Sequence, residues 1–285
     1  MRAYVLRWTL ITATIAAILS YRVAAADFDT GWAAFQQGRF TIAIAEWTPL
    51  AETGHPLAQY NLGVIYDSGL GVGRDVPAAL HWWTAAAESG LAEAQHNLGL
   101  LYTELNEDGL DADGGVLARQ WLQRAADGGF VRSQYFLGKM YADGVGTDPD
   151  PVRGYVLIRQ ASEAGLMQAQ YNLGKMYRDG QGVAADAEEA NRWWRLAAEQ
   201  GYAKAQDHLA ESYARGRGIA QDDVAALAWS MVAAWQGHPD SIARESALRG
   251  RLEPHAVALA RELAEVFGRS RPEPRRDGDD GSFQE

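Results

Sequence analysis

The sequence predicts an all-α fold, a right-handed superhelical α-solenoid of helix-turn-helix repeats. Two observations predict it. A six-residue phrase recurs five times, and the last positions of its copies are 36, 39, 36 and 36 residues apart. Around each copy, apolar residues recur every three or four positions, which is the spacing of one face of an α-helix. A helix pair of about 36 residues cannot bury its own apolar faces, so neighbouring units must stack on one another.

The composition allows a large folded core and excludes several classes of protein. The chain has 285 residues, of which 47% are hydrophobic. It contains no cysteine, which excludes disulfides, thiolate zinc sites, iron–sulfur clusters and cysteine nucleophiles. The 37 acidic side chains outnumber the 26 basic ones, for a net charge of −11. Because binding to nucleic acid depends on clustered lysine and arginine, we expect no nucleic-acid partner.

Residues 1–26 have the features of a secretory signal peptide. Arg2 and Arg7 make a basic start, an apolar run of 12 residues follows, and three alanines end at Ala26. The run is shorter than the ~20 residues that cross a bilayer, so we expect cleavage after Ala26 and no membrane span afterwards. The mature chain would lose three arginines, carry a net charge of −14 and be periplasmic or secreted, in a Gram-negative bacterium. Arg22, close to the cleavage position, leaves the alternative of an uncleaved anchor open.

The two ends of the array are expected to differ from its middle. Residues 27–54 should form a shorter helix pair that caps the N-terminal end, with a turn at Gly38. Residues 238–267 should form two capping helices at the other end. Terminal units differ because one of their faces has no neighbouring unit to pack against. Residues 268–285 have no apolar pattern and predict a disordered tail.

Five repeats fill the centre of the chain. Their first helices carry the recurring phrase, and in the first repeat Ala58, Leu62 and Tyr66 lie on one helix face. Their second helices carry alanines and tryptophans at helical spacing, which predicts a buried stripe. The predicted bounds of the repeats are 55–90, 91–129, 130–165, 166–201 and 202–237. We expect one column of the stripe to hold Trp82, Trp121, Leu157, Trp193 and Trp229.

Glycines mark the ends of the helices. In four repeats the first helix is followed by a Gly-x-Gly loop, as at Gly180 and Gly182, where we expect positive φ angles. A single glycine, as at Gly201, is expected to end the second helix in a left-handed conformation. The repeat 91–129 departs most from the others. Its segment Thr103–Gly115 is three residues longer and lacks Gly-x-Gly, so we expect a long acidic loop there.

The repeats share one sequence pattern, from which two of them depart in part. The first helix and its loop read Ala-x-Ala-Gln-x-Asn-Leu-Gly-x-x-Tyr-x-x-Gly-x-Gly-Val, and the second helix ends in Trp-Trp-x-x-Ala-Ala-x-x-Gly. This pattern resembles the Sel-one-like repeat (SLR), a relative of the tetratricopeptide (TPR) repeat with a longer inner loop. The resemblance covers roughly residues 55–237, and residues 28–54 resemble a TPR-like lead-in. Ala210, which replaces the last glycine of the phrase, departs from the pattern.

The resemblance implies an interaction scaffold. Bacterial members of the family are typically exported adaptors, regulators of envelope signalling or assembly factors, and they share no common active site. A cysteine-rich branch is associated with β-lactam binding or hydrolysis, but this chain has no cysteine. The resemblance therefore implies protein binding without catalysis.

The residues themselves also predict no catalytic, cofactor or metal site. No serine is followed three positions later by lysine, the pair that serine-based β-lactam chemistry requires. The Gly-x-Gly loops lack the third glycine and the preceding strand of a dinucleotide-binding loop. The acidic segment lacks oxygen ligands at two essential positions of a calcium loop. The six histidines show no spacing typical of a metal site.

The first helices are expected to line a concave groove. Residues beside the buried column then face this groove, and tyrosine and asparagine are adaptable contact residues. The predicted partner-binding residues are Tyr60, Asn61, His96, Asn97, Tyr135, Tyr171 and Asn172. The same row continues with Phe136, Asp207 and His208. An alternative for the asparagines is that each bonds to the backbone of the neighbouring repeat.

Together these features predict a non-enzymatic periplasmic scaffold that binds a protein or an extended peptide in its groove. It would act as an adaptor or a regulator of envelope signalling or assembly. Two alternatives stay open at this point. One is an envelope enzyme or binding protein that acts on peptidoglycan or β-lactams, and the other is a structural subunit of an export or motility complex.

Overall fold

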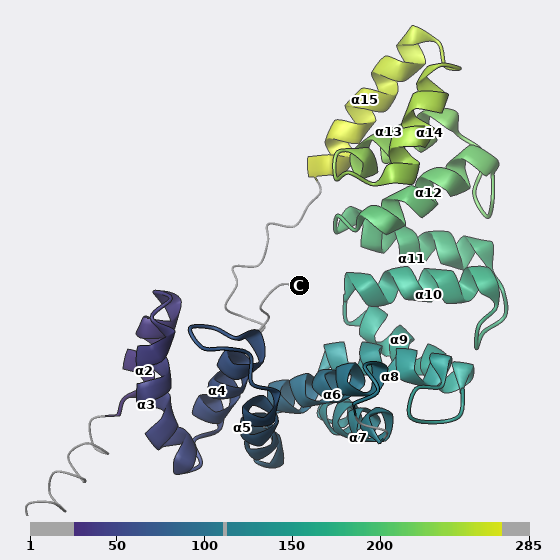
Figure 1. Ribbon diagram of the computed structural model, residues 1–285. Helices are drawn as coiled ribbons and strands as arrows, with labels where there is room; N and C mark the ends of the chain where they lie inside the picture. Colours follow the sequence, from purple (N-terminus) through teal and green to yellow (C-terminus); the bar gives the residue numbers. More distant parts are fainter. Residues whose placement is uncertain (1–25, 111–112, 270–285) are drawn as a thin grey trace, which may run out of the picture. The chain divides into compact units, whose positions relative to one another are not determined.

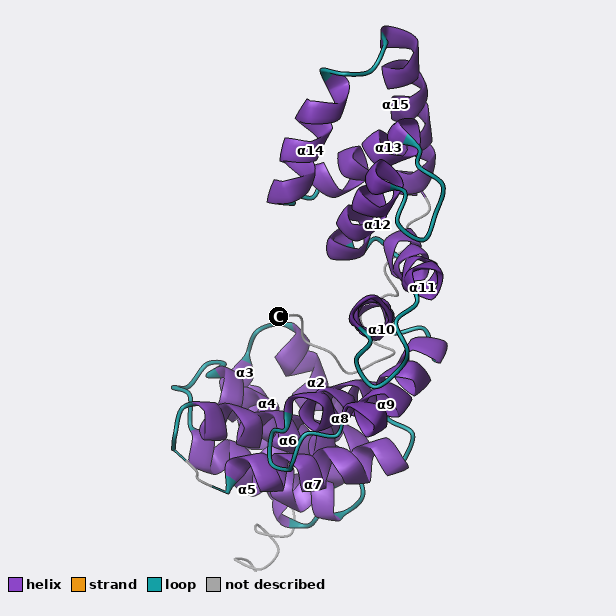
Figure 2. Cartoon of the chain, turned by 90° about the vertical axis from the view of Figure 1, so that its right-hand side faces the viewer, coloured by secondary structure: helices purple, strands orange, loops and turns teal. Residues whose placement is uncertain are grey.

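A computed structural model describes residues 26–110 and 113–269 of the chain. Within these ranges every regular element is an α-helix, and there are 14 of them (Figures 1 and 2). The all-α repeat fold that the sequence predicts is therefore confirmed. The predicted signal peptide and most of the predicted tail lie outside the described residues. None of the described helices combines the length and the apolar character that a membrane-spanning segment requires.

The chain divides into two compact units between residues 111 and 112. The N-terminal unit holds α2 to α6 and the C-terminal unit holds α7 to α15. The helices are α2 (Phe28–Gln36), α3 (Phe40–Glu52), α4 (Pro56–Ser68), α5 (Val76–Glu88), α6 (Ala92–Glu107), α7 (Gly114–Asp127), α8 (Val131–Asp143), α9 (Pro151–Glu163), α10 (Met167–Asp179), α11 (Ala187–Glu199), α12 (Ala203–Arg215), α13 (Asp223–Ala234), α14 (Pro239–Arg249) and α15 (Pro254–Arg269).

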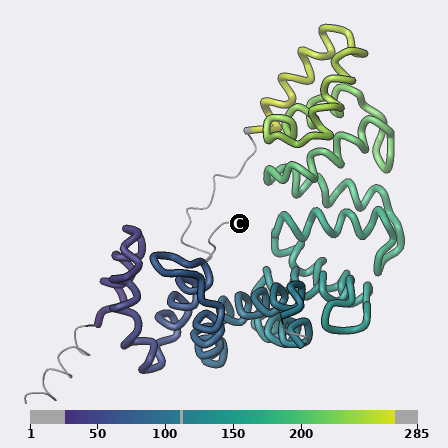
Figure 3. Tube along the Cα trace, viewed as in Figure 1, coloured from purple at the N-terminus to yellow at the C-terminus, as the bar shows by residue number. Residues whose placement is uncertain are grey.

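Within each unit, helices pack in chain order. In the N-terminal unit each of α2 to α5 contacts the next helix, and in the C-terminal unit each of α7 to α13 does the same. Figure 3 traces the Cα path of the C-terminal unit from teal to yellow as its helices run back and forth. The last helix of the repeats, α13, then contacts both α14 and α15. These two helices cover the apolar face that α13 would otherwise expose.

Aspartate side chains cap the starts of second helices, and glycines follow the ends of first helices. Asp75, Asp150, Asp186 and Asp222 precede second helices, and each side chain accepts a hydrogen bond from the first backbone N–H groups of its helix. These bonds satisfy amides that have no partner inside the helix. The loops after the first helices show the expected glycine conformations, with φ of 69° at both Gly180 and Gly182. A Cβ atom at Gly182 would also lie 2.0 Å from the Pro151 carbonyl oxygen of the preceding repeat.

A tryptophan packed on a glycine joins the two helices of a pair. A Cβ atom at Gly174 on α10 would lie 2.4 Å from Nε1 of Trp194 on α11, so only glycine fits. The same Nε1 donates a hydrogen bond to the carbonyl oxygen of Tyr171, at 3.2 Å. Equivalent contacts join α4 to α5 through Gly63 and Trp83, and α2 to α3 through Gly31 and Trp47.

The buried column of the second helices differs from the sequence prediction by one residue. Trp83, Ile158 and Trp194 face glycines of the first helices, and they are buried together with Leu122 at the equivalent position of α7. The preceding positions Trp82, Trp121, Leu157 and Trp193 are only half-buried. Successive residues on a helix differ in direction by about 100°, so only one residue of each Trp-Trp pair faces the glycine. Trp229 is the exception and is 1% exposed, because Phe267 of α15 stacks on it at 4.2 Å.

The alanine that departs from the repeat pattern has a partner that makes room for it. Twenty positions separate Gly174 from Trp194, and the same interval from Ala210 reaches Ser230. Ser230 is fully buried and donates its hydroxyl to the Ala226 carbonyl oxygen at 2.8 Å. Because a serine replaces the bulky indole, a methyl group fits on the facing helix.

Two segments expected to be irregular are partly helical. The first helix of the second repeat, α6, continues to Glu107, so the predicted acidic loop is helical over its first five residues. Arg74 binds Glu104 at 2.7 Å and thereby fastens this last part of α6 to the preceding loop. At the C-terminus, α15 continues to Arg269, two residues into the predicted tail. Gly268 lies against the ring of Trp235, which anchors this last turn.

The tryptophan–glycine contact can be tested with a double-mutant cycle. Gly174→Ala should destabilise the chain by about 1–3 kcal/mol, because the new methyl group overlaps the Trp194 ring. In a Trp194→Ser background, which copies the pair of Ala210 and Ser230, the same change should cost nothing or stabilise by up to ~1 kcal/mol, since alanine favours helix over glycine. Chemical denaturation of the four chains measures both effects. An equal cost in the two backgrounds would contradict the close contact.

Candidate functional site

The predicted row of partner-binding residues forms hydrogen bonds between neighbouring repeats. Asn97 on α6 donates its Nδ2 to the hydroxyl of Tyr60 on α4, at 3.4 Å. Asn172 on α10 likewise donates to the hydroxyl of Tyr135 on α8, at 2.9 Å. Both pairs join residues 37 positions apart in the sequence. We call this set of contacts between successive first helices the inter-repeat ladder.

The ladder continues through the C-terminal unit with different side chains. His208 on α12 lies with its Nε2 3.3 Å from the hydroxyl of Tyr171 on α10. Arg244 on α14 binds the carboxylate of Asp207 on α12. These pairs are also 37 positions apart, so the four contacts are equivalent in register. The chemistry thus changes from neutral pairs to a charged pair toward α14.

The structure places the seven predicted residues as follows. Tyr60, Asn61, Asn97, Tyr135, Tyr171 and Asn172 are half-buried, whereas His96 is only 5% exposed. The alternative for the asparagines is a bond to the backbone of the neighbouring repeat. Asn97 and Asn172 do bond to the neighbouring repeat, but the acceptor is a tyrosine hydroxyl and not the backbone. The ladder therefore holds five of the seven side chains in place between repeats, namely Tyr60, Asn97, Tyr135, Tyr171 and Asn172. Their contact with a partner remains a prediction.

A buried glutamine in the phrase has a structural role that the sequence did not reveal. Gln170 donates its Nε2 to the Ser162 carbonyl oxygen at 3.2 Å, and Gln206 donates to that of Ala198 at 3.0 Å. Each acceptor lies in the last turn of the preceding helix, where carbonyl groups lack partners within the helix. A constant interval of eight residues, also present from Gln59 to Ala51, was the available signal.

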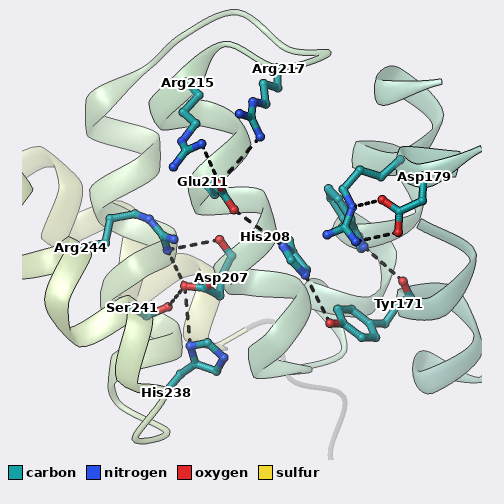
Figure 4. Close-up of polar contacts among 12 residues, drawn as sticks. Tyr171, Asp179, Asp207, His208, Glu211, Arg215, Arg217, His238, Ser241 and Arg244 are labelled. Carbon is teal, nitrogen blue, oxygen red and sulfur yellow. Dashed lines mark hydrogen bonds and ion pairs between the residues drawn. The ribbon is translucent and has the colours of Figure 1, made fainter. Parts of the chain in front are cut away.

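Asp207 is the centre of the polar cluster in Figure 4. Its side chain is 9% exposed, and its Oδ1 accepts hydrogen bonds from Ser241 Oγ at 2.5 Å and from the guanidinium of Arg244. The Nδ1 of His238 lies 3.6 Å from the same oxygen. Burial acts to raise the pKa of Asp207, but the hydrogen bonds from Arg244 and Ser241 outweigh it and lower this pKa below 3.8. The carboxylate is therefore charged at neutral pH.

Asp207 and His238, together with the nearby Asp240, also have an arrangement in which they could ligate a metal ion. One ligand atom from each of Asp207, His238 and Asp240 lies within 4.8 Å of the others. Sequence spacing missed this group because Asp207 is on α12 and the other two are at the start of α14. Arg244 already binds the Asp207 carboxylate, and its positive charge opposes a metal ion at the same oxygen. We therefore interpret the cluster as a buried ion pair that fastens α14 to α12.

His208 is enclosed by aromatic rings. Its imidazole stacks on Trp194 with ring centroids 4.6 Å apart and on Tyr171 at 5.6 Å. Burial, followed by the positive charge of Arg178, lowers the pKa of His208 below 6.5. The ring is therefore neutral at pH 7 and packs as an aromatic side chain.

Comparisons with known proteins agree with this repeat architecture. The family model described as Sel1 repeat matches residues 56–91, 92–130, 131–166, 168–202 and 203–238. A crystal structure of a Sel1 repeat protein from Oxalobacter formigenes is 29% identical, with 88% of this chain and 100% of that chain covered and a TM-score of 0.69. No protein with a curated description matches the sequence.

A second solved structure is also similar. It is a protective antigen of uropathogenic Escherichia coli with an SLR fold, 29% identical over 81% of this chain, with a TM-score of 0.73. The match covers 49% of that protein, so this chain spans about half of its length. Proteins built from Sel1 repeats generally mediate protein–protein interactions and are generally non-enzymatic.

The buried ion pair predicts a large and pH-dependent effect of removing one partner. Arg244→Gln should destabilise the chain by roughly 2–4 kcal/mol at pH 7, because it leaves the Asp207 carboxylate buried without a counter-charge. A lowered pKa stabilises the fold above the ordinary value of 3.8, and this stabilisation is lost as the pH falls through the folded-state pKa. The difference between the two chains in urea denaturation should therefore shrink below about pH 4.

The matched control for this ion pair removes both charges. The double variant Asp207→Asn, Arg244→Gln should be more stable at pH 7 than Arg244→Gln alone, since no unpaired charge remains buried. A double variant that is as unstable as or less stable than the single one would contradict the role of the pair.

The enclosed histidine predicts a second pH dependence. His208→Asn places at this position the residue that the ladder uses at Asn97 and Asn172. Because the folded chain resists protonation of His208, wild type should lose stability relative to this variant as the pH falls below 6.5. Thermal denaturation from pH 7.5 to pH 5 measures the difference. Parallel curves for the two chains would show that His208 is not buried as described.

Proposed function

Since the chain belongs to the Sel1 repeat family, we propose that it is a non-enzymatic scaffold that binds a protein partner along its first helices. We propose further that it does so in the periplasm, as an adaptor or a regulator of envelope signalling or assembly. The basic, apolar and alanine-rich features of residues 1–26 support export.

One observation supports the proposal that the first helices form the binding surface. The ladder holds tyrosine and asparagine side chains of successive first helices in register, and these side chains are only half-buried. A side chain that is already fixed by a neighbour loses little conformational entropy when a partner binds. Tyrosine also offers a large contact area together with a hydroxyl group. The ladder thus stabilises the stack and prepares a surface for recognition.

In-cell photo-crosslinking tests this proposal. A photoreactive amino acid at Tyr171, on α10, should capture a specific partner, whereas the same group at the exposed Arg192, on α11, should not. The captured protein would then be purified and its affinity measured against wild type and Tyr171→Ala. A tenfold or greater loss of affinity is expected, since a buried aromatic contact is commonly worth more than 1.4 kcal/mol. Equal capture at both positions, or unchanged affinity, would rule out this surface.

Export has its own test. Cell fractionation should find the chain in the periplasm, and N-terminal sequencing should start at Asp27. A full-length chain in the membrane fraction would instead show a retained anchor.

A further inference from the structure

Charge is distributed unevenly along this acidic chain. Residues 26–110 contain two arginines, no lysine and 11 acidic side chains, which gives a net charge of −9. Residues 113–269 contain 18 basic and 20 acidic side chains, which gives −2. Positive charge is therefore concentrated in the C-terminal unit, and part of it lies on the proposed binding surface.

Three basic residues follow the ladder tyrosines of α8 and α10, and two more lie at and just after the end of α12. Lys139 lies one helical turn after Tyr135 on α8, and Lys175 lies one turn after Tyr171 on α10. Residues four positions apart share a helix face, so each lysine lies on the same side as its tyrosine. Arg178 is one turn further along α10, and α12 ends in Arg215 with Arg217 in the following loop. We call Lys139, Lys175, Arg178, Arg215 and Arg217 the basic stripe.

The basic stripe is accessible and only partly neutralised. Lys175 is half-buried and the other four residues are exposed. Neither lysine forms an ion pair within 4.0 Å among the described residues, although Asp143 and Asp179 lie one turn after Lys139 and Lys175 on the same helices. Asp179 pairs with Arg178 at 2.6 Å, and Glu211 lies 3.3 Å from Arg215 and 3.9 Å from Arg217. Counted against Asp143, Asp179 and Glu211, the five basic residues leave a local excess of two positive charges.

The arginines of the stripe can exchange partners at low cost. Their ion pairs lie at the surface, where such pairs contribute little to the stability of the fold. A carboxylate from a bound partner can therefore compete with Asp179 and Glu211. The stripe is also partly fixed by aromatic rings, because Lys175 lies 6.0 Å from the ring centroid of Tyr171 and Arg178 lies 6.0 Å from that of Trp194.

We propose that the basic stripe, together with Tyr135 and Tyr171, binds an extended segment of a partner protein that is rich in aspartate and glutamate. This inference rests on the proposed function and specifies the chemistry of its partner. Arginine is suited to carboxylates because its planar fork donates two parallel hydrogen bonds. The overall charge of −11 opposes a long polyanion, whereas a short acidic segment meets mainly the local positive potential.

The geometry also limits the length of the segment. Helices whose side chains touch lie about 8–10 Å apart, so the stripe extends roughly 20 Å from α8 to α12. An extended chain advances about 3.3 Å per residue. About six residues therefore span the stripe, with a carboxylate needed at every second or third position.

Fluorescence anisotropy with the full mature chain and two synthetic peptides tests the inference. One labelled ten-residue peptide alternates glutamate with serine, and its matched control has glutamine in place of glutamate. We expect the acidic peptide to bind at least tenfold more tightly at 50 mM NaCl, and its binding to weaken at 300 mM NaCl because exposed charges are screened. Equal binding of the two peptides would overturn the proposal.

Matched variants separate the stripe from general electrostatics. Lys175→Gln with Arg178→Gln should weaken binding of the acidic peptide at least tenfold. Arg159→Gln with Arg192→Gln removes the same charge from exposed arginines on the second helices α9 and α11 and should have little effect. Circular dichroism would confirm that all chains are folded. An equal loss in both double variants would show non-specific attraction and overturn the proposal.

If the basic stripe binds another class of ligand, these experiments would give a different result. A single-stranded oligonucleotide that binds more tightly than the acidic peptide and depends on Lys175 and Arg178 would identify a nucleic-acid surface instead. Self-association in sedimentation that the stripe variant abolishes would identify a second copy of this chain as the occupant. Either result would overturn the inference. A partner captured through Tyr171 that binds the stripe variant normally would also overturn it, while the proposed function would stand.

Discussion

Close contact between a bulky side chain and a glycine sets the geometry of the helix pairs α2–α3, α4–α5, α8–α9 and α10–α11. The ring of Trp194 lies where a Cβ atom of Gly174 would be, and its N–H group binds the Tyr171 carbonyl oxygen. Packing fixes the distance between the helices, and the hydrogen bond fixes their offset along the axis. Because this bond is made to the backbone of Tyr171, it also positions the side chain that reaches the next repeat. Contacts within a pair therefore control contacts between pairs.

The pairs of the inter-repeat ladder occupy equivalent positions in successive repeats but differ in side-chain chemistry. Its pairs are tyrosine with asparagine, tyrosine with histidine and finally aspartate with arginine. The neutral pairs have half-buried members, whereas the last pair is a buried charge pair between α12 and the capping helix α14. A buried ion pair contributes little net stability, but a wrong register would leave Asp207 unpaired at high cost. The charged pair therefore favours one placement of α14.

The residues of the first helices differ in how much they contribute to stability and to the proposed recognition. Alanine, leucine and glycine face the partner helix, the ladder residues join neighbouring repeats, and the basic stripe is exposed except for the half-buried Lys175. In a repeat protein each unit contacts only its neighbours, so surface residues of one repeat can change with little effect on the others. A local positive surface can therefore exist on a chain whose net charge is −11.

Local sequence patterns determined much of this protein by themselves. Helical spacing, aspartate caps and glycines specify the helices and their order, because each acts within one or two turns. Other features were decided only by tertiary packing. Whether Trp193 or Trp194 faces the glycine depends on the rotation of one helix against another, and spacing alone leaves both choices open. The approach of Asp207 to Arg244 depends on how α12 and α14 stack. Such contacts join residues far apart in sequence, so no local pattern encodes them.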